Sequence, residues 1–398
     1  MINEVVNVSI DGAPQEDLVA DVVQLEVEES VTEADVFRLR LALRPLSDGT
    51  WSYVDDPRFQ VWKRFSVEAG YPDDTQTLID GYITHVELGF GAEQEAYLEL
   101  TGMDPSVRMN LEDKQLAWAN KKDHEIAQAL FTAHGLNYEV EDTVVQHAEA
   151  IATILQSETD IRFLRRLAVR NGFECYVRGN TGYFRSPDLQ QPPQKLLAVE
   201  FGPETNVSQL KIRLDGTAPT TTEIRRVDPL EKREETESLS ELPERRLGRQ
   251  TLGELRTGQP EGRMFLRREP SAAKEELQSR LRSAYAGASQ FLSVEGELDG
   301  RVYLAVLRSG RLVTLKGAGE RYSGLYYVTR VRHSFSVDGY TQSFEARRNG
   351  AGLTGEEQFE AATLPMAISL PSLGGGGGAA SGSKVLPPQQ AGRNFGGI

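Results

Sequence analysis

The hydrophobic and polar positions follow a period of two through most of the first hundred residues. In residues 37–43, Phe or Leu at every odd position alternates with Arg38, Arg40 and Ala42, so one face is apolar and the other is mostly polar. This alternation predicts half-buried β-strands. Further strands with turn residues between them are predicted at 5–10, 19–28, 64–68, 78–88 and 94–101. Many short strands with such turns favour a barrel or a sandwich.

A helical period replaces the strand pattern after residue 105. In residues 123–135, Ile126, Leu130 and Ala133 share one side, Asp123 is a candidate N-terminal cap and Gly135 a stop. A second helix is predicted from a capping-box-like start at 157–160 to Gly172, followed by a hairpin over 173–185. Residues 106–200 are therefore expected to form an inserted α/β domain.

Strand patterns return at 207–214 and 221–227, and a polar tract occupies 228–269. Its single aromatic residue is Phe265, so we predict a mobile loop or an arm that a partner orders. A helix is predicted from 270, with Leu277 and Leu281 on one stripe.

The last regular elements form a hairpin. Strands over 325–335 and 341–347 flank a two-residue turn that contains Asp338-Gly339. Beyond about residue 350 the periodicity ends, and a glycine run at 374–378 is typical of a flexible tail.

Composition narrows the possible classes. The 398 residues include 44 Lys+Arg and 59 Asp+Glu, a net charge of −15, which argues against a nucleic-acid binder. The single cysteine, Cys175, excludes a disulfide scaffold and a cysteine-based metal cluster. No apolar run approaches the length of a membrane span, and no signal peptide precedes the acidic start, so we expect no stable membrane insertion.

Candidate catalytic chemistry is sparse. His124-Glu125 lacks the second histidine of a zinc-protease motif, because the required position is Gln128. His85 and His333 fall on strands and are interpreted as barrel-wall residues, and Cys175 as a small core residue. We therefore predict no catalytic, metal-binding or cofactor-binding residues and no enzymatic activity.

Four arginines recur on the second predicted helix. Arg162, Arg165, Arg166 and Arg170 form a basic stripe. This stripe is either a solvated face or a docking surface for an acidic partner.

Several ordered motifs resemble phage tail hub proteins, which include the late control protein D family and the N-terminal hub region of VgrG. SETDIRFLRRLA at 157–168, followed by NGFECYV at 171–177, is similar to the family's helix and hairpin. Three further pieces agree in order, and the match spans about residues 60–348. These pieces are LIDGYI at 78–83, DHEIAQALFTAHGL at 123–136 and the hairpin over 322–345.

The resemblance implies a mainly β fold with α/β insertions. Each chain would carry two tube-type antiparallel β-barrel domains, and a homotrimer would form a pseudo-sixfold ring. The expected divisions are 1–105 for the first barrel, 106–200 for the α/β domain, and 201–228 with 294–350 for the second barrel. Residues 229–293 would form a polar arm and helix, and 351–398 a glycine-rich C-terminal tail.

The same resemblance implies a function. The chain would be a structural baseplate hub of a phage-like contractile tail or an extracellular contractile injection system. It would join a hexameric inner tube protein to a trimeric spike. We expect no fused spike and therefore a separate spike protein, with baseplate wedge or LysM-type adaptor proteins as further partners. Particles would assemble in the cytoplasm and could be released from the cell.

Two alternatives to the hub function remain, and the C-terminal tail gives a further prediction. The alternatives are a tail-associated peptidoglycan hydrolase and a carbohydrate-binding β-protein. The tail is predicted to lie against the spike, tube or neighbouring hub, with Val385, Leu386 and Phe395 as candidate anchors.

Overall fold

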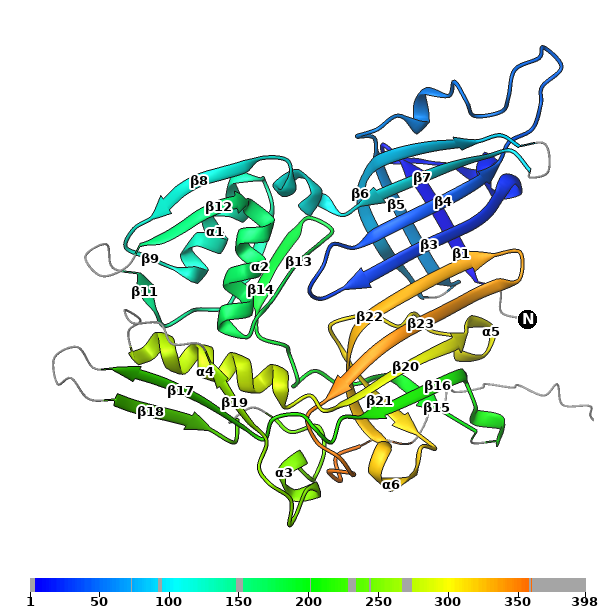
Figure 1. The fold of residues 1–398 in the computed structure, drawn as a ribbon. Helices are drawn as coiled ribbons and strands as arrows, with labels where there is room; N and C mark the ends of the chain where they lie inside the picture. Colours follow the sequence, from blue (N-terminus) through cyan, green and yellow to red (C-terminus); the bar gives the residue numbers. More distant parts are fainter. Residues whose placement is uncertain are drawn as a thin grey trace, which may run out of the picture. The chain divides into compact units, whose positions relative to one another are not determined.

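Strands dominate the fold (Figure 1). The computed structural model describes residues 4–72, 74–91, 95–147, 153–200, 202–227, 234–242, 245–266, 274–357 and 359. These residues all fall in one compact unit, Met1–Ala361. Within them, the largest sheet has 13 strands and is mostly antiparallel. A mainly β fold with large antiparallel sheets and α/β segments is therefore confirmed.

The N-terminal part of this sheet packs around its own core. Alternating residues of the strands, such as Leu25, Leu39 and Leu100, are almost fully buried, and Phe37 stacks on Phe65 at 3.9 Å. The strands are β1 (Val5–Ile10), β2 (Ala13–Pro14), β3 (Val22–Ser30), β4 (Val36–Ala42), β5 (Arg64–Tyr71), β6 (Asp74–Gly89) and β7 (Tyr97–Met103). Short 3-10 helices lie at η1 (Glu16–Asp21), η2 (Pro57–Phe59) and η3 (Pro105–Asn110).

The C-terminal part has a second core. It contains Val294, Tyr326 and Phe344. Its elements are β15 (Gln194–Ala198), η4 (Gly202–Glu204), β16 (Val207–Leu214), β20 (Leu292–Asp299), α5 (Gly300–Tyr303), β21 (Leu312–Lys316), α6 (Gly319–Tyr322), β22 (Gly324–Ser336) and β23 (Gly339–Arg348). The predicted hairpin over 325–347 is confirmed as β22 and β23.

The two parts join along one pair of strands. β22 pairs antiparallel with β3 from Arg330–Ser30 to Ser336–Gln24. The strand order is therefore continuous, β16-β20-β23-β22-β3-β4-β7-β6-β5-β1-β2 (Figure 1). Backbone hydrogen bonds across β22 and β3 thus connect residues about 300 positions apart in sequence.

An α/β segment lies between the two parts in sequence. Its core holds Phe131, Leu164 and Phe184 among others. The elements are β8 (Asp113–Trp118), β9 (Lys121–Lys122), α1 (Asp123–Ala133), β10 (Asn137–Val140), β11 (Gln146–His147), β12 (Ile154–Thr159), α2 (Asp160–Asn171), β13 (Glu174–Arg178) and β14 (Thr181–Arg185). Both predicted helices and the predicted hairpin are present.

The predicted N-terminal caps of these helices are wrong. The backbone N–H of Lys122 donates to Glu125 at 2.9 Å, while Asp123 is buried against Arg170 and His147. At α2, the expected capping-box residues 157–159 belong to β12, which pairs with β8. Residues 157–159 thus pair with a neighbouring strand, and α2 begins only at Asp160. Gly172 does end α2, at φ 73°.

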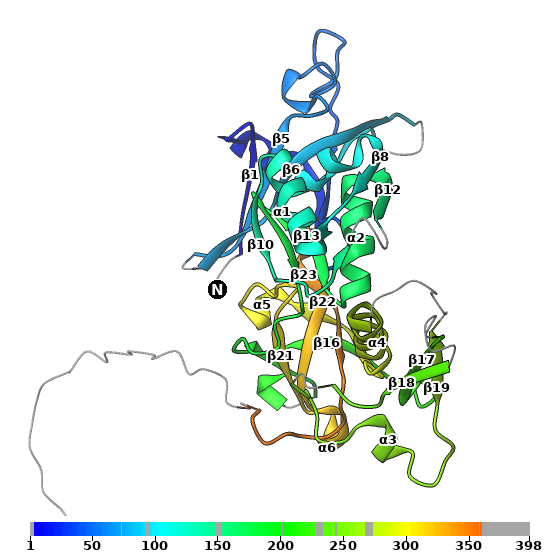
Figure 2. The same ribbon diagram turned by 90° about the vertical axis from the view of Figure 1, so that its left-hand side faces the viewer.

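The polar tract 228–269 contains regular structure, contrary to the predicted mobile loop or arm. β18 (Glu234–Leu239) and β19 (Arg263–Leu266) flank β17 (Thr221–Val227) in a small sheet. α3 (Leu252–Leu255) lies between β18 and β19 in sequence, and α4 (Lys274–Ala288) lies over the sheet in both views (Figures 1 and 2). Leu277 and Leu281 of α4 bury Ile224 of β17, so apolar side chains from outside the tract stabilise it.

Candidate functional site

One face of the large sheet carries a continuous array of charged side chains. Strand alternation places apolar residues in the two cores and sends their neighbours in sequence to this opposite side. Ion pairs cross the strands, with Arg332–Glu28 at 2.7 Å, Arg40–Glu99 at 2.6 Å and Lys211–Glu295 at 3.3 Å. We call this surface the charged face. It includes Glu26, Glu28, Arg38, Arg40, Glu87, Glu99, Lys211, Arg213, Glu295, Arg330, Arg332, Glu345 and Arg347.

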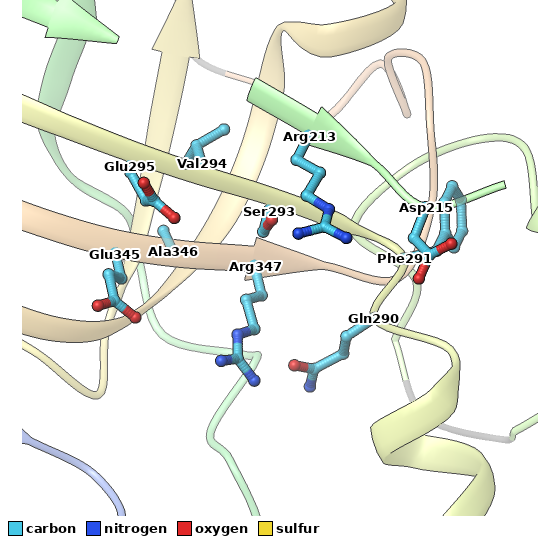
Figure 3. A pocket seen from close by; sticks show the side chains of 10 residues that line it. All are labelled: Arg213, Asp215, Gln290, Phe291, Ser293, Val294, Glu295, Glu345, Ala346 and Arg347. Carbon is cyan, nitrogen blue, oxygen red and sulfur yellow. The ribbon is translucent and has the colours of Figure 1, made fainter. Parts of the chain in front are cut away.

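A pocket of about 230 Å³ opens on this face near its β16 end. Figure 3 shows Arg213 and Arg347, from β16 and β23, on either side of Ser293. Glu295 and Glu345 lie together further along the strands (Figure 3). The lining is thus mostly polar or charged and comes largely from neighbouring strands, as expected for a polar contact surface.

The strands of the charged face form two matching quartets. The N-terminal quartet is β3, β4, β6 and β7, and the C-terminal quartet is β16, β20, β22 and β23. Within each, the spatial order is first, second, fourth and third in sequence. The path β16-β20-β23-β22 is therefore repeated by β3-β4-β7-β6.

The quartets also share their β-bulges. The register shifts between Ile83 and His85 in β6, and between Val328 and Arg330 in β22. The extra residue is a threonine in both strands, and its hydroxyl donates to the facing strand, Thr84 to Thr101 at 3.1 Å and Thr329 to Glu345 at 3.3 Å.

A second pair of bulges agrees in the same way. β3 shifts its register between Val22 and Gln24, and β16 between Val207 and Gln209. Bulges are local features of register that persist within families. Their coincidence at two positions identifies the quartets as an internal structural repeat.

A buried charge cluster lies beside the junction of the quartets. Glu29 of β3 has an exposed fraction of 0%. Its carboxylate lies 2.8 Å from the Arg308 guanidinium, 3.5 Å from that of Arg178 and 3.7 Å from the His333 ring. The Ser309 N–H and hydroxyl also donate to Glu29, at 3.3 and 3.4 Å.

The cluster joins segments that are distant in sequence. Arg178 comes from β13 of the α/β segment, and Arg308 precedes β21 and donates to the Thr77 carbonyl of β6 at 2.9 Å. The side chain of Asp35 accepts from the Ser30 N–H at 2.9 Å, and the N–H of Asp35 donates to Asp104 at 2.6 Å. The cluster therefore stabilises the relative positions of both quartets and the α/β segment.

Electrostatics divide the acidic groups into two kinds. Burial alone would raise the pKa of Glu29, but the guanidiniums of Arg308 and Arg178 outweigh it and hold that pKa well below its usual range. Burial raises the pKa of Asp35 well above its usual value and that of Asp104 to about 6. Glu29 is thus the charged partner of the two arginines at neutral pH.

The arginine stripe on α2 does not present a single surface. Arg170 pairs with Asp123 and lies 3.8 Å from Glu276 of α4, and Arg165 is half-buried. Only Arg162 and Arg166 are exposed, and Arg166 already pairs with Glu158 at 2.6 Å. Arg170 therefore uses its charge in contacts within the chain. Partner docking by Arg162, Arg165, Arg166 and Arg170 stays a prediction, and the exposed pair is the part of the stripe that a partner can reach most easily.

The other candidate residues occupy different environments. His333 is fully buried and its Nδ1 lies 2.8 Å from the Tyr340 hydroxyl, whereas His85 is exposed on β6. Burial raises the pKa of the Cys175 thiol to about 12, which favours the unreactive thiol form. The tail anchors Val385, Leu386 and Phe395 lie outside the described residues.

Sequence reasoning missed Glu29. It extends the apolar positions Leu25 and Val27, so an acidic residue occupies a core-facing position of β3. That break in the alternation is the signal that could have identified a buried charge.

Neither a metal site nor a membrane-spanning helix is found among the described residues. No group of three or more His, Cys, Asp or Glu side chains there is arranged to hold a metal ion. None of the helices in those residues has the length and apolarity needed to cross a membrane.

Solved structures with this fold come from phage tails and secretion systems. The 43 kDa tail protein of a Shewanella oneidensis prophage is 13% identical, with a TM-score of 0.63 over 87% of this chain and 99% of that one. An E. coli type VI secretion system component, described as structurally similar to T4 bacteriophage tail proteins, is 13% identical with a TM-score of 0.52, over 86% and 76% of the two chains. A Francisella PdpA–VgrG complex gives 9% identity and a TM-score of 0.50, over 87% and 58%.

These likenesses confirm, for the fold, the resemblance seen in the sequence motifs. None of the curated proteins matches the chain. A family model described as the Alg8 N-terminal domain matches residues 3–336, which is more than half of the sequence. The protein therefore belongs to the Alg8 N-terminal domain family and has the fold of phage tail proteins.

Proposed function

We propose that this protein is a structural baseplate hub of a contractile tail or an extracellular contractile injection system. In this role it forms a homotrimer that joins a hexameric inner tube to a trimeric spike. The observation that carries the proposal is the internal repeat of the two quartets. Because each chain supplies two equivalent units, three chains offer six units to a sixfold tube and three whole chains to a threefold spike.

The proposed division of the chain follows from this role. Residues 1–105 are one tube-type barrel, and 201–228 with 294–350 are the other. The α/β domain at 106–200 and the segment at 229–293 are peripheral to the ring, where they are available to wedge or adaptor proteins. The particle assembles in the cytoplasm and can be released from the cell.

A non-enzymatic role fits the candidate chemistry. His333 is fully buried and cannot reach a substrate, and the Cys175 thiol is protonated at neutral pH. The similar tail proteins also favour a structural role over the alternative of a peptidoglycan hydrolase. The charged face instead offers many exposed groups for polar contacts with other proteins in the particle.

We expect the purified full chain to form a homotrimer at micromolar concentration. Native mass spectrometry measures its mass, and negative-stain imaging should reveal a ring with six similar lobes around a channel. Tube and spike proteins added separately should each shift the trimer to a larger complex. A chain that stays monomeric alone and with both partners would overturn the proposal.

Deleting residues 371–398 is expected to abolish spike attachment and leave the trimer intact. The glycine run can pass through narrow gaps between subunits, and Val385, Leu386 and Phe395 follow it as apolar anchors. Co-sedimentation with the spike protein measures attachment, and native mass spectrometry of the truncated chain is the control. Unchanged attachment would disprove this role of the tail.

A further inference from the structure

Two strand edges lack partners in the described part of the chain, and they lie at opposite ends of the repeat. β16 is the end strand of the large sheet and pairs there only with β20. In β6, pairing with β5 covers Asp74–Tyr82, and the Ile83 backbone then contacts Trp62 and Lys63. Residues 84–89 of β6 keep β7 on one side and have an open edge on the other. Open edges favour pairing with another chain.

The internal repeat indicates which strand of the other quartet each open edge corresponds to. β6 is the third strand of its quartet, as β22 is of the other, and β22 uses the corresponding edge to pair with β3. β16 is a first strand, as β3 is. The junction inside the chain therefore joins a third strand to a first strand, and β6 and β16 are the third and first strands left without such a partner.

From these registers we propose that β16 of one copy pairs antiparallel with residues 84–89 of β6 in a second copy of this chain. This inference rests on the proposed trimeric hub and specifies how its copies join. Aligning the bulges makes Glu87 equivalent to Arg332 and Arg213 equivalent to Glu28. Because Arg332 lies opposite Glu28 inside the chain, Glu87 lies opposite Arg213 between copies.

The charges at this proposed contact are complementary. Inside the chain, the third strand contributes Arg332 and the first contributes Glu28, which pair at 2.7 Å. Between copies, the third strand contributes the acidic Glu87 and the first contributes the basic Arg213. The Tyr97 hydroxyl donates to one oxygen of Glu87 at 2.7 Å and leaves the other for a guanidinium.

The reversal of charge also selects the correct partner strand. Pairing β6 with β3 of another copy would bring Glu87 opposite Glu28. Pairing β22 with a second β16 would bring Arg332 opposite Arg213. Both mistakes place like charges together, so the two junctions are expected to alternate around the ring.

Apolar exposure along β6 supports the same contact. Val86 and Leu88 are each 39% exposed, and Phe90 is 54% exposed. Their equivalents at the internal junction are Val331, His333 and Phe335, which are 0%, 0% and 7% exposed. A neighbouring β16 would cover these side chains with Leu210, Ile212 and Leu214.

Closure into a ring follows from the kind of contact. Joining β16 to β6 uses two different surfaces, so the contact is head-to-tail and propagates until rotation closes it. If each contact between copies repeats the geometry of the internal junction, the rotation from one quartet to the next is the same all around the ring. Three copies then supply six quartets related by six equivalent rotations.

The test exchanges the two charges in the full-length chain. Glu87→Arg and Arg213→Glu should each weaken trimer formation about 100-fold, because each places like charges in the contact. The double variant Glu87→Arg with Arg213→Glu should recover trimerisation to within about 10-fold of the unmodified chain. Glu68→Arg, an exposed charge reversal on β5, is the matched control and should leave the trimer unchanged. Sedimentation velocity measures each equilibrium, and circular dichroism verifies that each variant is folded.

A second measurement tests the register directly. The double variant Glu87→Cys with Arg213→Cys should form disulfides between copies under mild oxidation, whereas Glu68→Cys with Arg213→Cys should not. Trimers that persist in both single charge reversals without this cross-link would overturn the proposed contact and leave the trimeric hub standing. A wild-type chain that never trimerises, even with tube and spike proteins, would overturn both.

Discussion

Replacing Glu29 with glutamine is expected to lower the free energy of unfolding by about 3–5 kcal/mol, the usual cost of removing one partner from a buried ion pair. The substitution leaves the guanidiniums of Arg308 and Arg178 beside a neutral amide. Asp35 cannot take over, because burial raises its pKa well above the usual value. Urea unfolding followed by circular dichroism measures the change.

Glu33→Gln is the matched control for this result. Glu33 pairs with Arg330 at 3.1 Å, but its side chain is 62% exposed, so its loss should cost at most about 1 kcal/mol. Equal losses for the two variants would mean that the cluster contributes no more than a surface ion pair.

The consequence of Glu29→Gln should extend to assembly. The cluster connects β3, β13 and the segment before β21, and β3 and β22 form the junction between the quartets. A ring closes only if each junction keeps its angle, since errors add around the circle. We therefore expect this variant to yield fewer closed trimers than Glu33→Gln at the same protein concentration.

Glu174→Gln is expected to stabilise the protein at pH 8 and to reduce its loss of stability between about pH 5 and 8. Glu174 of β13 is buried and accepts from the Tyr327 hydroxyl at 2.8 Å. Burial raises the pKa of Glu174 to about 7, although Tyr327 opposes this change.

The sign follows from proton linkage. Between the unfolded pKa of 4.5 and the folded pKa of about 7, the folded state binds more protons. Stability is thus complete below the unfolded pKa and falls as pH rises through the folded pKa. At about 1.4 kcal/mol per pH unit, the loss from this group reaches roughly 3 kcal/mol.

Thermal melting at a series of pH values measures this effect. The unmodified chain should melt at lower temperature at pH 8 than at pH 5, and Glu174→Gln should flatten that slope. Asp35 and Asp104, whose pKa values burial also raises, should leave a residual slope in the variant. Glu139→Gln, an exposed residue that pairs with Arg185 at 2.9 Å, is the control. Identical slopes for Glu174→Gln and the unmodified chain would contradict the assignment.

Local periodicity was enough to predict most of the regular elements. The alternation at 37–43 and 325–347 gave β4 and the β22–β23 hairpin, because a half-buried strand needs one apolar face. The stripe Ile161, Leu164 and Leu167 gave α2, and Gly172 ended it because glycine readily adopts positive φ. Ordered motifs added the likeness to tail hubs, which the solved structures confirm for the fold.

Features that depend on contacts between distant segments were decided only by the tertiary structure. The tract at 228–269 is polar by itself, yet Leu277 and Leu281 of α4 supply the apolar surface against which its small sheet packs. The α2 arginines look alike in sequence, but packing sends Arg170 inward to Asp123. Local pattern specifies which face of an element is apolar, and the neighbouring chain decides what covers that face.

The sequence by itself determined that this protein is mainly β, that two helices lie between its strand-rich blocks, and that its motifs resemble tail hubs. It contains the charged residues Glu28, Arg332, Glu87 and Arg213, but it does not indicate which of them lie opposite one another on paired strands. Strand register decides that question, because a shift of one residue moves every side chain to the other face. The shared bulges of β6 and β22 set that register only in the folded chain, and they revealed the repeat.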